Sequence, residues 1–329
     1  MSFSDITERE NYQMVLDNKV PEWVPCSHRA VDIIPDPINE QGIRFQGGRD
    51  VFGVNWLVTE GTALAPTPDP GEILLRDVTK WKEAFRPPDL SCIDWAGLAE
   101  SAERNIDRKE KMILFDSQNF CFQRLMSLMG LEGSLIALYE EPEACYEFFD
   151  AVTNYKLDIL RHVDKYFHPD IFCCFDDVAH KTNLFLSADM FRTLIKPHYM
   201  RFYKEVIDRG MIPEHHICGF CEDIYQDLAD CGIRITNPAE PVNDIALAQQ
   251  KYHDQLIFRG GIDSFGKYSW TEDNDEMLRA EVRRCMDNYA PAGNYIFAVL
   301  GLYLPGPWIP FPKPMEEEYD RLRFRYRHG

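Results

Sequence analysis

The sequence predicts an α/β protein built as a (β/α)8 TIM barrel with an irregular N-terminal extension. From about residue 93, apolar strand segments alternate with helical segments through short connections, which is the pattern of a parallel sheet. The strand segments are nearly continuous apolar runs, as expected for strands buried on both faces. At least six such units follow one another, and no G-x-G-x-x-G fingerprint follows the first strand. This combination favours a closed barrel over a doubly wound sheet.

The regular region divides into strands and helices in strict order. The predicted strands are 111–117, 170–177, 211–219, 232–238, 255–263 and 294–301. The predicted helices are 93–109, 120–129, 142–166, 188–209, 222–231, 244–252, 272–289 and about 314–326. No linker interrupts this series. We therefore expect residues 1–329 to form a single domain, with a cap in 1–90 and the regular units in 91–329.

The N-terminal part has a different character. Thr7 and Glu10 form a capping box that starts a first helix, and the segment NKVPEWVPC ends it. Residues 30–90 are rich in proline and glycine, so we expect loops and short strands there rather than regular units.

Charge and cysteine content exclude several classes of protein. The formal net charge is −19 and the pI about 4.9. The chain therefore lacks the excess of basic residues typical of a nucleic-acid-binding protein, and its negative charge disfavours binding to anionic membranes. The longest apolar run, 295–304, is about half a membrane span. The first residues lack the apolar core of a secretory signal, and ten cysteines are too few for a disulfide scaffold in 329 residues. These features predict reduced thiols and a cytoplasmic protein.

Polar residues stand where the predicted strands end. In barrels of this type the active site lies at the carboxyl ends of the strands. Some of these side chains will cap the helices that follow, so the convergence of several strand ends carries more weight than any one residue. The candidates are Asp116, Ser117, Asp176, Asp177, His216, Cys218, Asn237, Glu240, Asp263 and Tyr303.

The segment HHICGFCED (215–223) is the densest of these strand ends. His216 and Cys218 are two residues apart, so on a strand their side chains point the same way and could clamp one Zn²⁺. Only one ligand cluster is visible, which favours a catalytic zinc with open positions over a structural one. A plain polar strand end is the main alternative. The Cys218–Cys221 spacing is also that of a redox CxxC, but such a motif normally opens a small βαβ domain.

The order of several segments resembles the uroporphyrinogen decarboxylase superfamily. TERENYQMVLDNKVPEWVPC is similar to its N-terminal helix and first strand, and CCFDDVAHKTNLFLSADMFRTLIKPHYMRFYKEV is similar to its central segment. HICG, NPAEP and FRGGID follow in the same order. The resemblance implies the barrel fold independently. The arginine-rich MRQAGR segment of true uroporphyrinogen decarboxylases is replaced by CSHRAVDIIPD, in which only Arg29 remains, so tetrapyrrole decarboxylation is not expected.

The HICG form resembles the corrinoid-dependent methyltransferases of this superfamily. In the thiol-methylating members, His-x-Cys supplies two zinc ligands and a later cysteine the third, whereas this chain has Leu302 at that place. This difference argues against thiol methylation as the activity. It leaves Cys221, Glu240 and Asp177 as alternative candidates for the third zinc ligand. The D-x-H-x-x-G motif of corrinoid-binding modules is missing from the sequence, so the corrinoid would come from a separate protein.

The resemblance implies a methyltransferase that demethylates a small methylated compound, a methoxylated aromatic above all, and passes the methyl group to cobalamin on that partner. His216 and Cys218 would bind zinc, and Asp176 or Asp177 would position substrate or act as the acid. Because neighbouring residues of a strand face opposite ways, at most one of the two acids is expected at the site centre. Asn237, Glu240 and Tyr303 would line the substrate pocket. The alternatives are a decarboxylase of another substrate, with Asp177 and an arginine, and a non-catalytic small-molecule binding protein.

Overall fold

Seven parallel strands form the central sheet of the protein, in the order β1-β5-β6-β9-β10-β11-β12. The structure, a computed structural model, describes residues 6–41, 46–59, 66–263, 274–299 and 311–326. The strands are β1 (Val31–Pro35), β5 (Met112–Ser117), β6 (Ile171–Phe175), β9 (Ile212–His216), β10 (Ile235–Ala239), β11 (Ile257–Gly261) and β12 (Tyr295–Ala298). The predicted parallel α/β architecture is confirmed, and each of the six predicted strands overlaps one observed strand.

The sheet is curled, and its two edges approach each other. Cys26, which precedes β1, forms a parallel bridge with Phe297 of β12. The backbone N–H of Phe297 donates to the Pro25 carbonyl at 2.8 Å. Within the described ranges the central sheet has seven strands, so the predicted eighth strand of the barrel is not among them.

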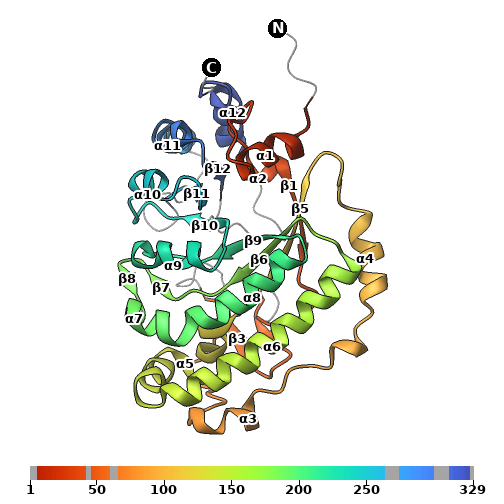
Figure 1. Cartoon of the computed structure of the whole chain (residues 1–329), viewed down its shortest axis with the longest axis vertical. Helices are drawn as coiled ribbons and strands as arrows, with labels where there is room; N and C mark the ends of the chain where they lie inside the picture. The colour runs from red at the N-terminus through yellow and green to blue at the C-terminus, as the bar shows by residue number, and fades with distance from the viewer. Residues whose placement is uncertain (1–5, 42–45, 60–65, 264–273, 300–310, 327–329) are drawn as a thin grey trace.

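Helices cover the outer side of the curled sheet (Figure 1). Their bounds are α1 (Glu8–Leu16), α2 (Ser27–Ala30), α3 (Trp81–Ala84), α4 (Trp95–Glu103), α5 (Cys121–Glu140), α6 (Pro142–Tyr166), α7 (Ala188–Met190), α8 (Lys196–Asp208), α9 (Tyr225–Asp230), α10 (Ile245–Lys251), α11 (Asp275–Tyr289) and α12 (Lys313–Leu322). The helix predicted over 188–209 is divided by a π-helical stretch, Phe191–Ile195, between α7 and α8. Among the described helices, none is both long and apolar enough to cross a membrane.

The N-terminal part has the short, irregular elements that its composition predicts, except that Val31–Pro35 form β1 of the central sheet. The capping box of α1 is present, with Thr7 accepting from the Glu10 backbone and Glu10 from that of Thr7. Three short strands, β2 (Gly48–Arg49), β3 (Asn55–Leu57) and β4 (Thr67–Pro68), pair antiparallel as a separate small sheet. Another small hairpin, β7 (Ala179–His180) with β8 (Asn183–Leu184), follows β6.

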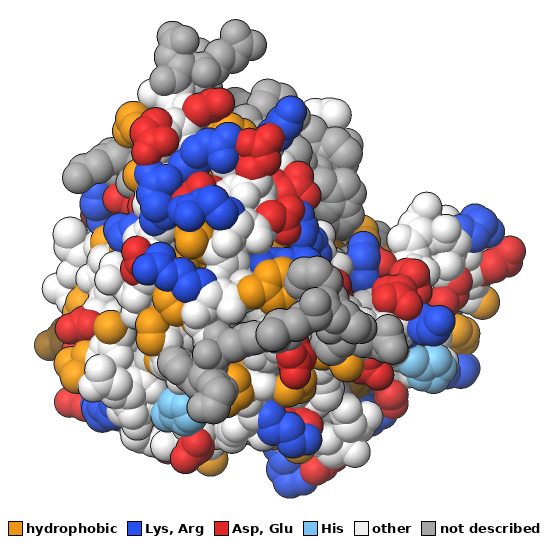
Figure 2. Space-filling model, turned by 90° about the horizontal axis from the view of Figure 1, so that it is seen from above, with side chains coloured by type: hydrophobic (Ala, Val, Ile, Leu, Met, Phe, Trp, Pro, Cys, Tyr) orange, Lys and Arg blue, Asp and Glu red, His pale blue; other side chains and the backbone are white. Residues whose placement is uncertain are grey.

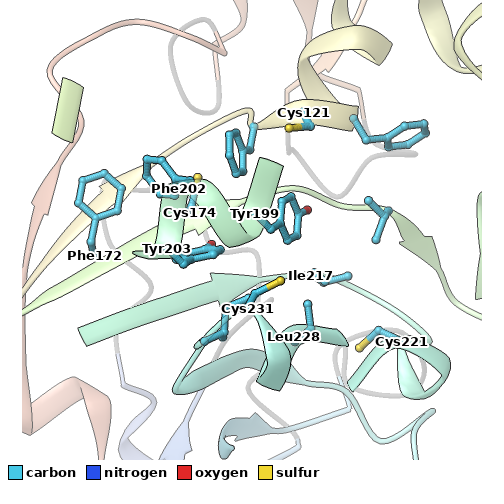
Figure 3. Packing of buried hydrophobic residues seen from close by; sticks show 14 of the residues in the cluster. Cys121, Phe172, Cys174, Tyr199, Phe202, Tyr203, Ile217, Cys221, Leu228 and Cys231 are labelled. Carbon is cyan, nitrogen blue, oxygen red and sulfur yellow. The ribbon is translucent and has the colours of Figure 1, made fainter. Parts of the chain in front are cut away.

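Side chains on each strand alternate between two cores, as period-two geometry requires. On β6, Ile171 and Cys173 join a small cluster inside the curled sheet, which α1 closes with Tyr12. Phe172 and Cys174 join the large cluster between the strands and the helices. Figure 3 shows this outer packing, with Tyr199 and Tyr203 of α8 set against the β6 and β9 region. The alternation fixes which strand-end residues face the interior of the sheet.

Charged side chains of both signs are interspersed on the face seen in Figure 2. Around α12, Arg29 pairs with Glu316 at 2.9 Å and Arg283 pairs with the buried Glu318 at 3.2 Å.

Candidate metal centre at the strand ends

Three of the predicted side chains come together at the carboxyl ends of β6 and β9. The potential ligand atoms of Asp177, His216 and Cys218 all lie within 4.8 Å of one another. The alternation explains this meeting, because His216 and Cys218 flank the outward-facing Ile217, and Asp177 follows the outward-facing Asp176. Among the described residues this is the one group of three or more possible ligands with such spacing.

His216 is held firmly on both sides of its ring. Its Nδ1 lies 2.7 Å from Oδ1 of Asn237, and its Nε2 lies 3.2 Å from Sγ of Cys218. The ring stacks on Phe175 with a centroid separation of 4.0 Å and an interplanar angle of 16°. Phe175 and His216 are register partners on adjacent strands, which accounts for the stacking. The imidazole is thus fixed with Nε2 toward Cys218.

Asp177 and Cys218 are also linked directly. The backbone N–H of Cys218 donates to Oδ1 of Asp177 at 2.7 Å, and Nε2 of Gln123 donates to the other oxygen, Oδ2, at 2.8 Å. Burial, followed by the carboxylates of Asp177 and Glu240, raises the pKa of the Cys218 thiol well above its ordinary value. A metal ion bound here would therefore have to displace the thiol proton.

Gly219 permits this strand end to pack against the β7–β8 hairpin. Its φ of +95° lies in the left-handed region, and an added Cβ would meet the His180 carbonyl oxygen at 2.4 Å. The next residue, Phe220, donates its N–H to that same oxygen at 2.9 Å. The glycine in HHICGFCED is thus explained by close backbone approach.

Asp176 faces away from this centre, toward the helices. Its two oxygens accept from the backbone N–H groups of Phe122 at 3.0 Å and Gln123 at 2.7 Å, at the start of α5. The Tyr199 hydroxyl donates to it at 2.8 Å. Burial raises the pKa of Asp176 to about 7, against the lowering effect of these hydrogen bonds. Of the two acids predicted for catalysis, Asp177 lies at the centre and Asp176 anchors the first turn of α5.

The remaining predicted residues have different positions. Asn237 contacts His216 directly, and Glu240, buried after β10, is close enough to raise the pKa of Cys218. Cys221 lies in the outer core beside Leu228 and Ile217 (Figure 3), and burial raises its pKa to about 12. It does not belong to the group of possible ligands. Tyr303 and Leu302 lie outside the described residues.

Three residues of the site were not predicted from the sequence. Gln123 orients Asp177 from the first turn of α5, and Glu214 and Arg259 form an ion pair inside the curled sheet below His216. Burial raises the pKa of Glu214, while the Arg259 guanidinium opposes that rise. An arginine within the apolar run QLIFRGGID was the available signal for this pair.

The donor set of this centre fits a zinc ion. One imidazole nitrogen, one thiol sulfur and one carboxylate oxygen are the atoms that Zn²⁺ prefers, and three protein ligands leave a fourth position for substrate, as in catalytic zinc sites. The ring nitrogen of His216 that faces away from Cys218 already has a hydrogen-bond partner, which is a usual feature of zinc-binding histidines.

A family model and a solved structure each match more than half of the chain. The family model for uroporphyrinogen decarboxylase (URO-D) matches residues 121–302, which is more than half of the chain. The chain is similar in structure to a methyltransferase from Methanosarcina mazei, with a TM-score of 0.69 and 14% sequence identity over 96% of this chain and 99% of that one. A second solved structure, the YdhT protein from Bacillus subtilis, matches with a TM-score of 0.38 and 11% identity over 70% of this chain and 72% of that one. No curated protein sequence matches the chain significantly.

Proposed function

Because the chain belongs to the uroporphyrinogen decarboxylase family, we propose that it is a corrinoid-dependent methyltransferase that demethylates a small methoxylated aromatic compound. The observation that carries the proposal is the grouping of Asp177, His216 and Cys218 at the carboxyl ends of β6 and β9. The fold shared with a protein described as a methyltransferase adds support. Family membership also supports completion of the curled sheet to an eight-stranded barrel.

In this proposal Asp177, His216 and Cys218 bind a zinc ion. When bound, zinc supplies a Lewis acid that draws charge from the ether oxygen and so improves a poor leaving group. The protein holds the three ligands ready: Gln123 and the Cys218 backbone orient Asp177, and Asn237 with Phe175 orients His216. Glu240 is assigned to the pocket wall beside Cys218, and we retain Tyr303 there as a prediction.

The methyl acceptor is the cobalt of a corrinoid carried by a separate protein. The carbon–oxygen bond of the ether would break with its electron pair left on oxygen. The partner's corrinoid would supply Co(I), whose electron pair would form the new bond to the methyl carbon. Because the centre lies where the strands end, substrate and corrinoid would both approach from the carboxyl face of the sheet.

A decarboxylase, the rival function expected from the sequence, gains no support from Arg29. This arginine stands in the segment that replaces the family's substrate-binding motif, yet it pairs with Asp320 at 2.5 Å and Glu316 at 2.9 Å on α12. The Arg29 guanidinium is therefore already paired with two carboxylates of the protein, and a substrate carboxylate would have to compete with them.

The test supplies the zinc-loaded protein with cob(I)alamin and a panel of methoxylated benzoates. We expect one equivalent of methylcobalamin for each phenol released, and no phenol when cob(I)alamin is omitted. Phenol formed without any corrinoid, CO2 release from the panel, or no turnover of any member by the zinc-loaded protein would contradict the proposal.

A further inference from the structure

A line of buried polar side chains runs through the interior of the curled sheet to His216. Arg259 on β11 pairs with Glu214 on β9, and Glu214 in turn accepts a hydrogen bond from Nδ2 of Asn237 on β10. Oδ1 of Asn237 then lies 2.7 Å from Nδ1 of His216. Arg259, Glu214 and Asn237 are 4%, 0% and 1% exposed, so these contacts are shielded from bulk solvent.

The chemistry of each group fixes the direction of the next hydrogen bond. The carboxylate of Glu214, paired with a guanidinium that only donates, can only accept. Asn237 must therefore turn its NH2 group to Glu214 and its carbonyl oxygen to His216. A carbonyl oxygen accepts, so Nδ1 of His216 must carry the proton. The lone pair is then left on Nε2, the atom that faces Cys218 at 3.2 Å.

We propose that Glu214, Arg259 and Asn237 are positioning residues that set the Nδ1–H tautomer of His216 before any metal binds. This inference rests on the zinc site of the proposed function. It gives the polar residues inside the curled sheet a role in orienting a zinc ligand. An imidazole in the opposite tautomer would present an N–H to the metal and would have to lose or move that proton first. The buried ion pair thus acts through Asn237 to keep the lone pair of His216 on Nε2, the atom that would bind the metal.

The tautomer can be read without metal or substrate. In protein labelled with ¹⁵N-histidine and stripped of metal, long-range ¹H–¹⁵N spectra distinguish Nδ1–H from Nε2–H, and His216→Gln identifies the signal. We expect Nδ1–H in the wild type, although histidine in water favours Nε2–H. Asn237→Ala should abolish this preference. In Glu214→Gln the amide at 214 can donate as well as accept, so we expect both tautomers.

Zinc affinity, measured by competition with a chromophoric chelator, provides the second readout. Asn237→Ala should weaken zinc binding by roughly 10- to 100-fold, the usual effect of removing a partner of a metal-bound histidine. Glu214→Gln should weaken it by less. The matched control is Asn294→Ala, which removes another buried asparagine, 3% exposed, whose Nδ2 donates to the Gln249 and Leu256 carbonyls rather than to a group of the metal centre. Its zinc affinity should equal that of the wild type.

Two results would overturn the proposal. One is a wild-type His216 that carries its proton on Nε2. The other is a wild-type tautomer and zinc affinity in both Asn237→Ala and Glu214→Gln, with folding verified by circular dichroism. A wild type that has Nδ1–H and binds zinc but transfers no methyl group would overturn the proposed function and leave this inference standing.

Discussion

At the residue scale, the direction in which a side chain leaves its strand decides its role. Asp176 and Asp177 are neighbours of the same type, yet one accepts hydrogen bonds from the first turn of α5 and the other lies beside His216 and Cys218. Strand geometry predicts that they face opposite ways, and their position after an apolar run predicts that they stand at a strand end. Which of the two faces inward depends on register, which the structure supplies.

The unpredicted residues share a physical cause. Gln123, Glu214 and Arg259 are buried and polar, and each is stabilised by a partner distant in sequence. A sequence shows polarity but not the partner that compensates burial. The sequence therefore predicted the inward-facing strand ends and Asn237, but not Gln123, Glu214 and Arg259.

Asp36, at the end of β1, should make stability depend on pH. Burial, then the charge of Glu40, raises its pKa from 3.8 to about 7, against the effect of Lys156. Because the folded-state pKa is the higher one, its contribution to stability is complete below about pH 4 and is lost as pH rises through about 7. In Asp36→Asn the side chain stays neutral, and the Ser117 hydroxyl can reverse to accept from it.

Urea unfolding of both proteins at several pH values measures this effect. We expect the free energy of unfolding of the wild type to fall relative to Asp36→Asn as pH rises from about 4 to about 7. Asp176, whose pKa is also about 7, is present in both proteins and cancels from the difference. Parallel profiles would show that Asp36 titrates as it does in the unfolded chain.

At the scale of elements, glycines mark where the regular pattern is interrupted. The helix predicted over 120–129 stops at Gly130, whose φ of 72° lies in the left-handed region, but helical structure resumes and α5 extends to Glu140. Alternating apolar segments identified the strands because burial on both faces leaves a strong compositional signal. Helix ends and the β7–β8 hairpin were harder to predict from the sequence, because their hydrogen bonds depend on tertiary partners.

Gly219 should tolerate a side chain less well than Gly210. Both have positive φ, so alanine at either position costs about 1–2 kcal/mol in backbone strain. At Gly219 the new Cβ would also meet the His180 oxygen at 2.4 Å, whereas at Gly210 it would meet nothing within 4 Å. We expect a larger loss of unfolding free energy for Gly219→Ala in urea titrations. Equal losses would contradict the close packing inferred there.

At the scale of the whole molecule, a buried ionic cluster attaches the N-terminal cap to the helices. Arg124 of α5 pairs with Glu40 at 3.0 Å and Asp50 at 3.3 Å, and Lys156 of α6 pairs with Glu40 at 2.8 Å. All four side chains are at most 1% exposed. The cap is therefore bound by charges as well as by apolar packing.

Removing one charge from this cluster should be costly. Arg124→Met leaves Asp50 without its buried cation and should lower the free energy of unfolding by about 3–5 kcal/mol. The control is Arg104→Met, which breaks an exposed pair with Glu100 at 3.3 Å and should cost about 0–1 kcal/mol. Similar values for the two variants in urea titrations would mean that the cluster does not hold the cap.

The zinc content of three proteins purified with zinc available tests the proposed metal centre most directly. The wild type should retain about one zinc per chain, as a site with three protein ligands does. Cys218→Ser should retain little and lose methyl transfer, while Cys221→Ser should match the wild type in both, since Cys221 lies in the outer core. A wild type without zinc, or a Cys218→Ser protein with full zinc and activity, would contradict the assignment of Asp177, His216 and Cys218 as a catalytic metal centre.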